Sequence, residues 1–156
     1  YGYHGRRRGG DLSTKVKIKH DMRNATNKVD RVITQEARDA IISLINSFQS
    51  DIKISMRNSP QTGNIYPRGD QPPHIASSKG NPPRPDEGIL VNSILKMMTG
   101  LLSGEVFTNV GSAEILEDKN NLDRPFMSER SVAGKQLRKN AKRLFGNIKV
   151  GKIQRG

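Results

Sequence analysis

The clearest hydrophobic pattern runs from residue 29 to residue 56, where apolar residues recur at steps of three or four. This spacing lines one face of an α-helix. It predicts a single long helix that begins near Asp21 or Asn24, both acceptable N-caps, and ends at about Arg57. Residues 52–56 also alternate with period two, so a strand at the end of this segment is the alternative. The apolar stripe comprises Val29, Val32, Ile33, Ala37, Ala40, Ile41, Leu44, Ile45, Phe48, Ile52 and Met56.

Alternation of apolar and polar residues predicts strands in three other segments. Thr14–Lys19 places Val16 and Ile18 between lysines, which is typical of a short strand at a sheet edge with one face in water. Residues 105–110 predict a second strand. Its partner is predicted over residues 94–99, although this region also fits a helical pattern.

Two further helices are predicted in the second half of the chain. Residues 112–117 predict a short helix with Ser112 as its cap. The last helix begins at about Pro125, because proline is tolerated in a first turn, where its missing N–H would have no partner. Lysines and arginines occupy the other faces of this helix. Its apolar stripe comprises Ala133, Leu137, Ala141, Leu144 and Phe145.

A segment rich in proline and glycine separates the long helix from the second half of the chain. Seven of the eight prolines and four glycines fall between residues 60 and 88. Proline locks φ and has no backbone N–H, so neither a helix nor a central strand can cross this segment. We therefore predict an extended, stiff loop over residues 58–89. Such a long loop is unusual in a small domain unless it contacts a partner.

These elements together predict an α+β fold, in which a long N-terminal helix packs on a small antiparallel β-sheet and a basic helix lies near the C-terminus. The 156 residues are 33% hydrophobic and include no tryptophan, which suits one domain with a modest aliphatic core. We expect this domain over residues 14–146. Residues 1–13 are expected to form a flexible basic arm, and residues 147–156 a basic tail.

The net charge of +12 is concentrated at the two ends of the chain. Residues 1–20 hold six basic residues and one acidic residue, whereas residues 135–156 hold eight basic residues and no acidic residue. Basic ends of this kind contact phosphates or an acidic protein surface, or serve only to keep a protein in solution. No apolar run approaches the roughly 20 residues that span a bilayer, so no membrane contact is expected.

Candidate catalytic residues are few. The chain has no cysteine, which excludes disulfides, thiolate metal sites and cysteine nucleophiles. His74, Ser77 and Asp86 could form a catalytic trio, but no nucleophile-elbow motif accompanies them, and a Pro/Gly-rich segment is a poor support for catalytic geometry. The three histidines also lack the spacing of a zinc site. We therefore expect no enzymatic activity and no cofactor.

Three acidic residues, Glu114, Glu117 and Asp118, form a small patch on the predicted short helix. Two or three carboxylates rarely suffice for a metal site, so a solvated face or a salt bridge with the basic tail is the simpler interpretation. A phosphate-binding loop is also absent from the sequence, because the Gly-Lys pair at residues 134–135 lacks the upstream glycine of that motif.

The Pro/Gly-rich segment contains TGNIYPRG followed by HIASSKGNPPRPDEGILVNSI, which together combine four features in order. These are a Thr-Gly-x-Ile-Tyr start, a His-x-Ala-Ser segment, a Gly-x-x-Pro step and an Asp-x-Gly-x-Leu-x-x-Ser-Ile end. VFTNVG and an Arg-Pro-Phe sequence follow at residues 106–111 and 124–126. Over residues 25–140 this order resembles the family of gene product ten of lambda-like phages, which are neck and tail-completion proteins of tailed bacteriophages.

The resemblance implies a structural virion protein without catalytic activity. Such a protein forms a ring, for example a hexamer, and acts as a completion or terminator subunit that joins the tail to the head connector. Its implied partners are copies of itself, the connector or head-closure protein, and tail-tube or terminator proteins, in a virion assembled in the host cytoplasm. The implied subunit-interface or loop-anchoring residues are Tyr66, His74, Pro83, Leu90, Arg124 and Phe126.

The basic ends are not part of the family pattern, and Glu87 and Ser112 also depart from it. We expect the basic ends to contact packaged DNA nonspecifically or an acidic partner. The alternative function is a basic nucleic-acid-binding protein of ribosomal or nucleoid type, although these segments lack the interleaved aromatic residues of single-strand binders. The expected contact residues are Arg6, Arg7, Arg8, Lys135, Arg138, Lys139, Lys142 and Arg143.

Overall fold

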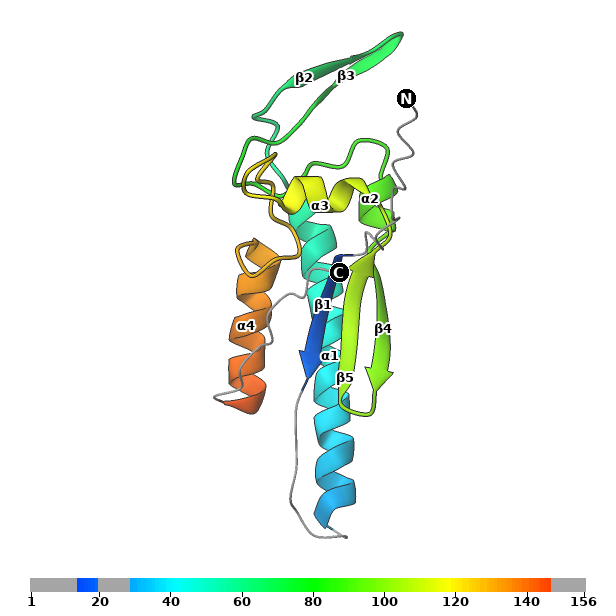
Figure 1. The fold of residues 1–156 in the computed structure, drawn as a ribbon, viewed down its shortest axis with the longest axis vertical. Coiled ribbons are helices and arrows are strands. Elements are labelled where there is room, and N and C mark those ends of the chain that lie inside the picture. The colour runs from blue at the N-terminus through cyan, green and yellow to red at the C-terminus, as the bar shows by residue number, and fades with distance from the viewer. Residues whose placement is uncertain (1–13, 20–28, 147–156) are drawn as a thin grey trace, which may run out of the picture.

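The computed structural model describes residues 14–19 and 29–146, and its fold is α+β, which confirms the predicted class (Figure 1). The predicted helix start near Asp21 or Asn24, the arm over residues 1–13 and the tail over residues 147–156 lie outside the described residues. In chain order the elements are β1 (Thr14–Lys19), α1 (Val29–Arg57), β2 (Ile65–Arg68), β3 (Gln71–Ile75), α2 (Ile89–Asn92), β4 (Leu95–Gly100), β5 (Ser103–Thr108), α3 (Ser112–Glu117) and α4 (Val132–Phe145).

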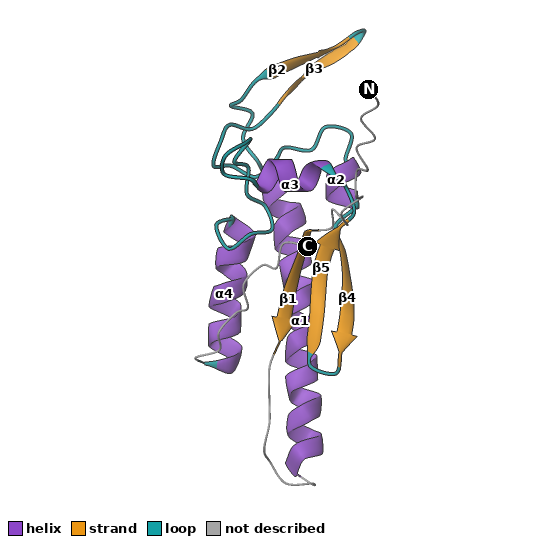
Figure 2. Cartoon of the chain, in the orientation of Figure 1, coloured by secondary structure: helices purple, strands orange, loops and turns teal. Residues whose placement is uncertain are grey.

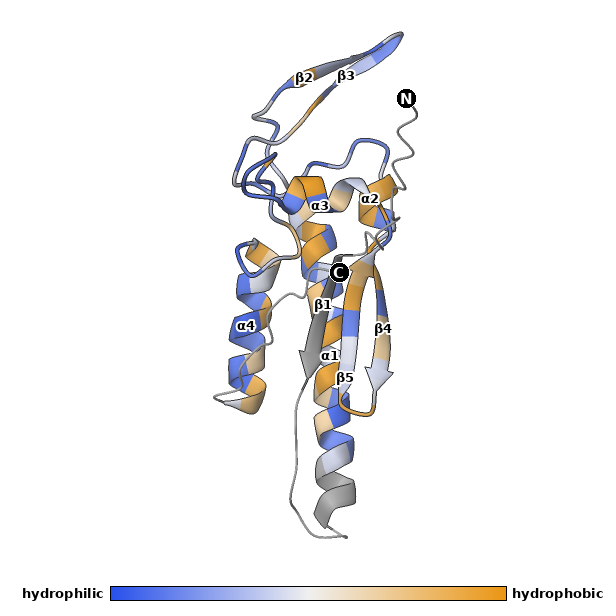
Figure 3. Cartoon of the chain, viewed as in Figure 1, coloured by the Kyte–Doolittle hydropathy of each residue, from blue (hydrophilic) through white to orange (hydrophobic). Residues whose placement is uncertain are grey.

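The long helix α1 carries the largest part of the core. From Ala37 onward its predicted apolar stripe is buried, except for the half-buried Ala40, and the helix packs against both the sheet and α4; Figure 3 shows hydrophobic segments along it. The helix continues through residues 52–56, so the alternative of a strand there is wrong. It ends at Arg57, where Asn58 N–H donates to the Ile54 carbonyl at 2.9 Å. The buried stripe residues are Ala37, Ile41, Leu44, Ile45, Phe48, Ile52 and Met56.

A three-stranded antiparallel sheet of order β1-β5-β4 lies beside α1 (Figure 1). The central strand β5 turns Val106 and Thr108 into the core, where both are fully buried. Because side chains alternate along a strand, Gly104 lies on the same face, against α1. The predicted strand over residues 94–99 is confirmed as β4, so the helical alternative for this region is wrong.

Helix α4 packs along α1 and buries Ala133, Leu137 and Ala141. The predicted start at Pro125 is wrong, because the helix begins at Val132. Ser131 is the N-cap, and its Oγ accepts a hydrogen bond from Gly134 N–H at 2.9 Å. Leu144, predicted on the apolar stripe, is instead 45% exposed, and Phe145 is the residue of this turn that packs against the core.

The short helix α3 has the predicted bounds but not the predicted cap. Gly111 occupies the N-cap position, no side chain caps the helix, and Ser112 is its first helical residue. The first turn is closed instead through the backbone, since Ala113 N–H donates to the Val110 carbonyl at 3.0 Å. The prediction of Ser112 as the cap is therefore wrong.

The predicted loop over residues 58–89 contains a β-hairpin, formed by β2 and β3, which corrects the expectation that this whole segment is loop. Both strands of a two-stranded sheet are edge strands, and each is hydrogen-bonded along one side only. Proline, which has no backbone N–H, is tolerated in edge strands, so the hairpin can include Pro67, Pro72 and Pro73. Gly69 lies at the turn with a φ of 57°, a conformation that favours glycine. The hairpin extends away from the helices and the larger sheet (Figure 2).

Within the described residues, no helix has the length and apolarity needed to cross a membrane.

Candidate interface site

The base of the hairpin is held by backbone contacts that leave no space for a side chain at Gly63. Gly63 N–H donates to the Ala76 carbonyl at 2.8 Å, and Ala76 N–H donates to the Asn64 carbonyl at 3.0 Å. A Cβ atom on Gly63 would lie 2.3 Å from the Ser77 carbonyl oxygen. The glycine of the Thr-Gly-x-Ile-Tyr pattern therefore permits this close strand approach.

The hairpin presents apolar side chains to solvent. Ile65 is 64% exposed and Tyr66 is 45% exposed. The Tyr66 ring stacks on the ring of His74, its partner across the ladder, with centroids 6.3 Å apart and an interplanar angle of 27°. A two-stranded hairpin is only marginally stable alone in water, so a hairpin with exposed apolar residues suits a contact with another molecule.

One carboxylate joins the hairpin to the loop that precedes α2. Asp86 forms an ion pair with Arg68 of β2, and its Oδ1 lies 3.3 Å from His74 Nδ1 of β3. Both hairpin side chains are largely buried, whereas the Asp86 side chain is about half exposed. Asp86 thus connects both strands of the hairpin to residues 81–88.

Two further arginines approach this site from neighbouring segments. Arg84 Nη1 donates to the Ser59 carbonyl at 2.8 Å, and the Gln61 amide lies against Arg84 Nε and Nη2 at 3.1 and 2.9 Å, with its oxygen assigned toward these donors. Arg124 follows α3, and its backbone N–H donates to the Leu116 carbonyl at 2.7 Å. We call Arg68, Arg84 and Arg124 the arginine cluster.

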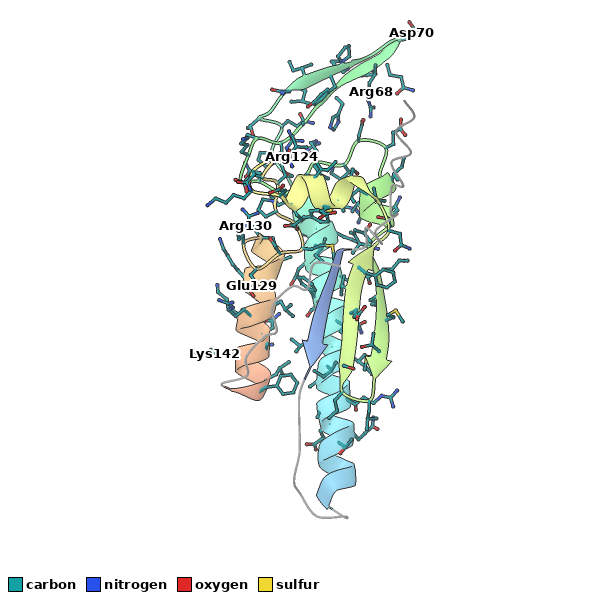
Figure 4. The ribbon with its side chains drawn as sticks, in the orientation of Figure 1. Arg68, Asp70, Arg124, Glu129, Arg130 and Lys142 are labelled. Carbon is teal, nitrogen blue, oxygen red and sulfur yellow. The ribbon has the colours of Figure 1, made fainter. Side chains whose placement is uncertain are left out.

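Contacts between loops fix the relative positions of the arginine cluster. Ser59 Oγ at the end of α1 donates to the Pro82 carbonyl, and Gly80 N–H donates to the Asp123 carbonyl at 2.7 Å. The segment around Arg84 is therefore bound to the end of α1 and to the residue before Arg124. Figure 4 shows Arg68 on the hairpin and Arg124 on the segment between the hairpin and the helices.

The charge of the arginine cluster acts on His74. Burial is the main cause that lowers the pKa of His74 below its usual value of 6.5, and the positive charges of Arg68, Arg84 and Arg124 lower the pKa further. The lowered pKa favours the neutral form of the imidazole beside Asp86. Elsewhere, on α1, burial raises the pKa of Asp51 above 3.8.

The six residues assigned through the family resemblance occupy two different environments. Tyr66 and His74 lie on the hairpin, and Arg124 is partly exposed beside it. Pro83 is buried and Leu90 packs against the core, while Phe126 is completely buried within it. The second group can anchor the segment but has little surface left for another molecule.

The expected DNA or acidic-partner contacts are brought together only in part. Arg6, Arg7 and Arg8 lie outside the described residues. The other five residues are all exposed on α4, where one of them, Arg138, donates to Glu129 at 2.5 Å. Figure 4 shows another of them, Lys142, on this helix. These five are Lys135, Arg138, Lys139, Lys142 and Arg143.

Glu117 has a structural role that the sequence interpretation missed. Its Oε1 accepts hydrogen bonds from the backbone N–H groups of Phe126, Met127 and Ser128, at 2.8, 2.5 and 3.0 Å. Arg130 Nη2 also donates to the Glu117 carbonyl at 2.7 Å. The acidic patch predicted as solvated thus contains the acceptor that holds residues 126–128 outside a helix. A glutamate on a short helix gives no sequence signal of this contact.

Of the three residues considered as a possible catalytic trio, the structure brings only His74 and Asp86 into contact. His74 and Asp86 are in contact, whereas Ser77 is fully buried and its Oγ has no hydrogen-bond partner within the described residues. No group of three or more histidines and acidic residues in this part of the chain could hold a metal ion. The arrangement therefore offers charge and apolar contact surface.

Comparison with known proteins found no family model that matches the chain, and no similar curated protein or solved structure.

Proposed function

We propose that the chain is a non-enzymatic structural subunit of a tailed-bacteriophage virion. In this proposal it forms a ring at the neck, as a tail-completion or terminator protein, and joins the tail to the head connector. The observation that supports this function is the hairpin of residues 65–75, which extends from the body and exposes Ile65 and Tyr66. The resemblance to neck proteins supplies the kind of assembly, and the hairpin supplies a surface that such an assembly would cover.

The arrangement of the anchoring residues supports the same function. Pro83, Leu90 and Phe126 hold the base of the segment in or against the body, so the hairpin projects from a fixed support. A projecting arm with a fixed base can reach a neighbouring subunit without a large loss of conformational entropy on binding.

The proposal predicts that hairpin variants impair assembly without unfolding the body. Replacing Ile65 or Tyr66 with serine is expected to weaken ring formation at least about tenfold, because each change removes apolar contact area at the interface. Ile54→Ser is the matched control, since Ile54 is 51% exposed but lies on α1 and not on the hairpin. Native mass spectrometry and negative-stain microscopy would measure the rings, and circular dichroism would check the fold.

Two outcomes would contradict this function. One is a wild-type protein that stays monomeric at high concentration and is absent from purified phage particles. The other is an equal loss of assembly for Ile65→Ser and Ile54→Ser, which would mean that the hairpin makes no specific contact.

The second candidate function is nucleic-acid binding, and the exposed basic side chains of α4 favour it. For duplex DNA, a plot of log affinity against log salt concentration has a negative slope. The double variant Lys139→Gln/Arg143→Gln is expected to make this slope shallower by about two, if each residue neutralises one phosphate. Fluorescence anisotropy across a salt series measures this slope. If the slope is the same for the double variant and the wild type, and the wild type forms rings, α4 is excluded as a DNA contact.

A further inference from the structure

The arginine cluster has more guanidinium groups than carboxylate partners. Asp86 pairs with Arg68, but neither Arg84 nor Arg124 forms an ion pair within the described residues. Arg84 is bound by neutral acceptors, which are the Ser59 carbonyl and the Gln61 amide. Arg124 Nε is buried and has no hydrogen-bond partner in this part of the chain. Two guanidinium charges thus remain without a carboxylate.

An unbalanced, partly buried charge is unfavourable in an isolated protein. Removal of a guanidinium donor from water costs free energy unless an acceptor replaces the water. Arg84 and Arg124 are both partly buried, and the contacts of Gly80 with Asp123 and of Ser59 with Pro82 hold their segments in place. The site is therefore already arranged for an anion, which a binding partner can supply at a small cost in ordering.

We propose that the arginine cluster binds an acidic side chain of a partner protein, through Arg124 above all. This inference rests on the proposed function, because it assigns the chemistry of the partner that the hairpin meets. A planar guanidinium pairs with a carboxylate through two parallel hydrogen bonds. Arginine and tyrosine together are typical of the centre of a protein interface, and Tyr66 lies exposed on the same hairpin as Arg68.

The partial burial of the arginine cluster favours a protein carboxylate over DNA. Nonspecific DNA contacts use fully exposed cations that follow the phosphate backbone. The lysines and arginines of α4 have this exposure, whereas Arg84 and Arg124 do not. A single carboxylate needs access to only one guanidinium, so partial burial restricts it less than it restricts a duplex backbone.

The test measures binding of a fluorescein-labelled hexaglutamate peptide to the full-length protein at near-physiological salt by fluorescence anisotropy. Arg124→Gln is expected to weaken binding at least about tenfold, since a charge-assisted hydrogen bond is lost. Arg124→Lys should restore part of the affinity, because it keeps the charge without the planar donors. Arg130→Gln is the matched control, because Arg130 is already bound by Asp123 and by the Glu117 carbonyl. Thermal melting would show that each variant is folded.

The outcomes separate this inference from the proposed function. Equal weakening by Arg124→Gln and Arg130→Gln, or no weakening by either, would overturn the inference even if the wild type forms rings. The inference also fails if Arg124→Gln weakens binding of a short DNA duplex and leaves hexaglutamate binding unchanged. A third outcome is that only Arg124→Gln weakens peptide binding while the wild type never forms rings. This outcome would support the acidic-partner site and reject the ring.

Discussion

Replacing Glu117 with alanine is expected to lower the free energy of unfolding by about 3 kcal/mol, because three backbone N–H groups lose one shared acceptor. These groups belong to Phe126, Met127 and Ser128, and the side chains of Phe126 and Met127 lie in the core. Loss of the carboxylate leaves donors without partners and releases the segment that places two core side chains. Urea unfolding followed by circular dichroism measures the change.

Glu114→Ala is the matched control for this prediction. Glu114 lies on the same helix α3 and is exposed, so its replacement is expected to change the free energy of unfolding by no more than about 0.5 kcal/mol. Glu117→Gln should fall between the two, since the amide oxygen remains an acceptor but carries no charge. A loss below about 1 kcal/mol for Glu117→Ala would show that water replaces the carboxylate at little cost.

Adding one methyl group at Gly104 is expected to destabilise the protein by about 2 to 3 kcal/mol. A Cβ atom there would lie 2.1 Å from Ile45 Cδ1 and 2.9 Å from the Met97 carbonyl oxygen. Ile45 is buried in the core and cannot move into solvent, and the Met97 carbonyl belongs to the paired strand β4. The Gly104→Ala variant must therefore separate α1 from the sheet or shift β4. Chemical denaturation of the variant gives the magnitude.

A double-mutant cycle identifies the cause of that loss. Ile45→Val removes the Cδ1 atom and alone costs about 1 kcal/mol, because it leaves a small cavity. Combined with Gly104→Ala, it should give a total loss smaller than the sum of the two by about 1 kcal/mol, because the methyl group fills the vacated space. The contact with the Met97 carbonyl remains, so the recovery is partial. Strict additivity would mean that Ile45 and Gly104 are not in contact in solution.

The elements with a regular hydrophobic period were predicted well. The stripe that ends in Phe48, Ile52 and Met56 predicted which face of α1 is buried, because one helical face carries these residues. The helix-breaking residues 58–60 predicted its end at about Arg57. The alternation around Val106 similarly predicted the central strand β5. Local sequence is sufficient in these segments, since side-chain period and burial follow the same geometry.

The errors arose where a distant residue competes with the local rule. Pro125 satisfies the rule for a helix start, but the Glu117 carboxylate binds the N–H groups of residues 126–128, and Ser131 caps α4 instead. The rule that excludes proline from strands holds for central strands only, so it did not exclude the hairpin. The contact of Glu117 cannot be read from the residues that neighbour Pro125.

Some residues of the candidate site were identified from the sequence, whereas the contacts between them were found only in the structure. Their shared place in the Pro/Gly-rich segment brought His74, Ser77 and Asp86 under consideration as a trio, and the resemblance singled out Tyr66 and Arg124. The charge of Arg124 acts on His74 because the fold brings together segments far apart in the chain, as in the contact of Gly80 with Asp123.

The amino-acid sequence was thus enough for the α+β class, the long helix, the three strand segments of the larger sheet and the basic charge of the chain ends, because each follows from local period or composition. Tertiary structure alone decided how the hairpin is attached to the body, the start of α4 and the arginine cluster. Their positions depend on hydrogen bonds and charges between residues distant in the chain, whose partners no local pattern specifies.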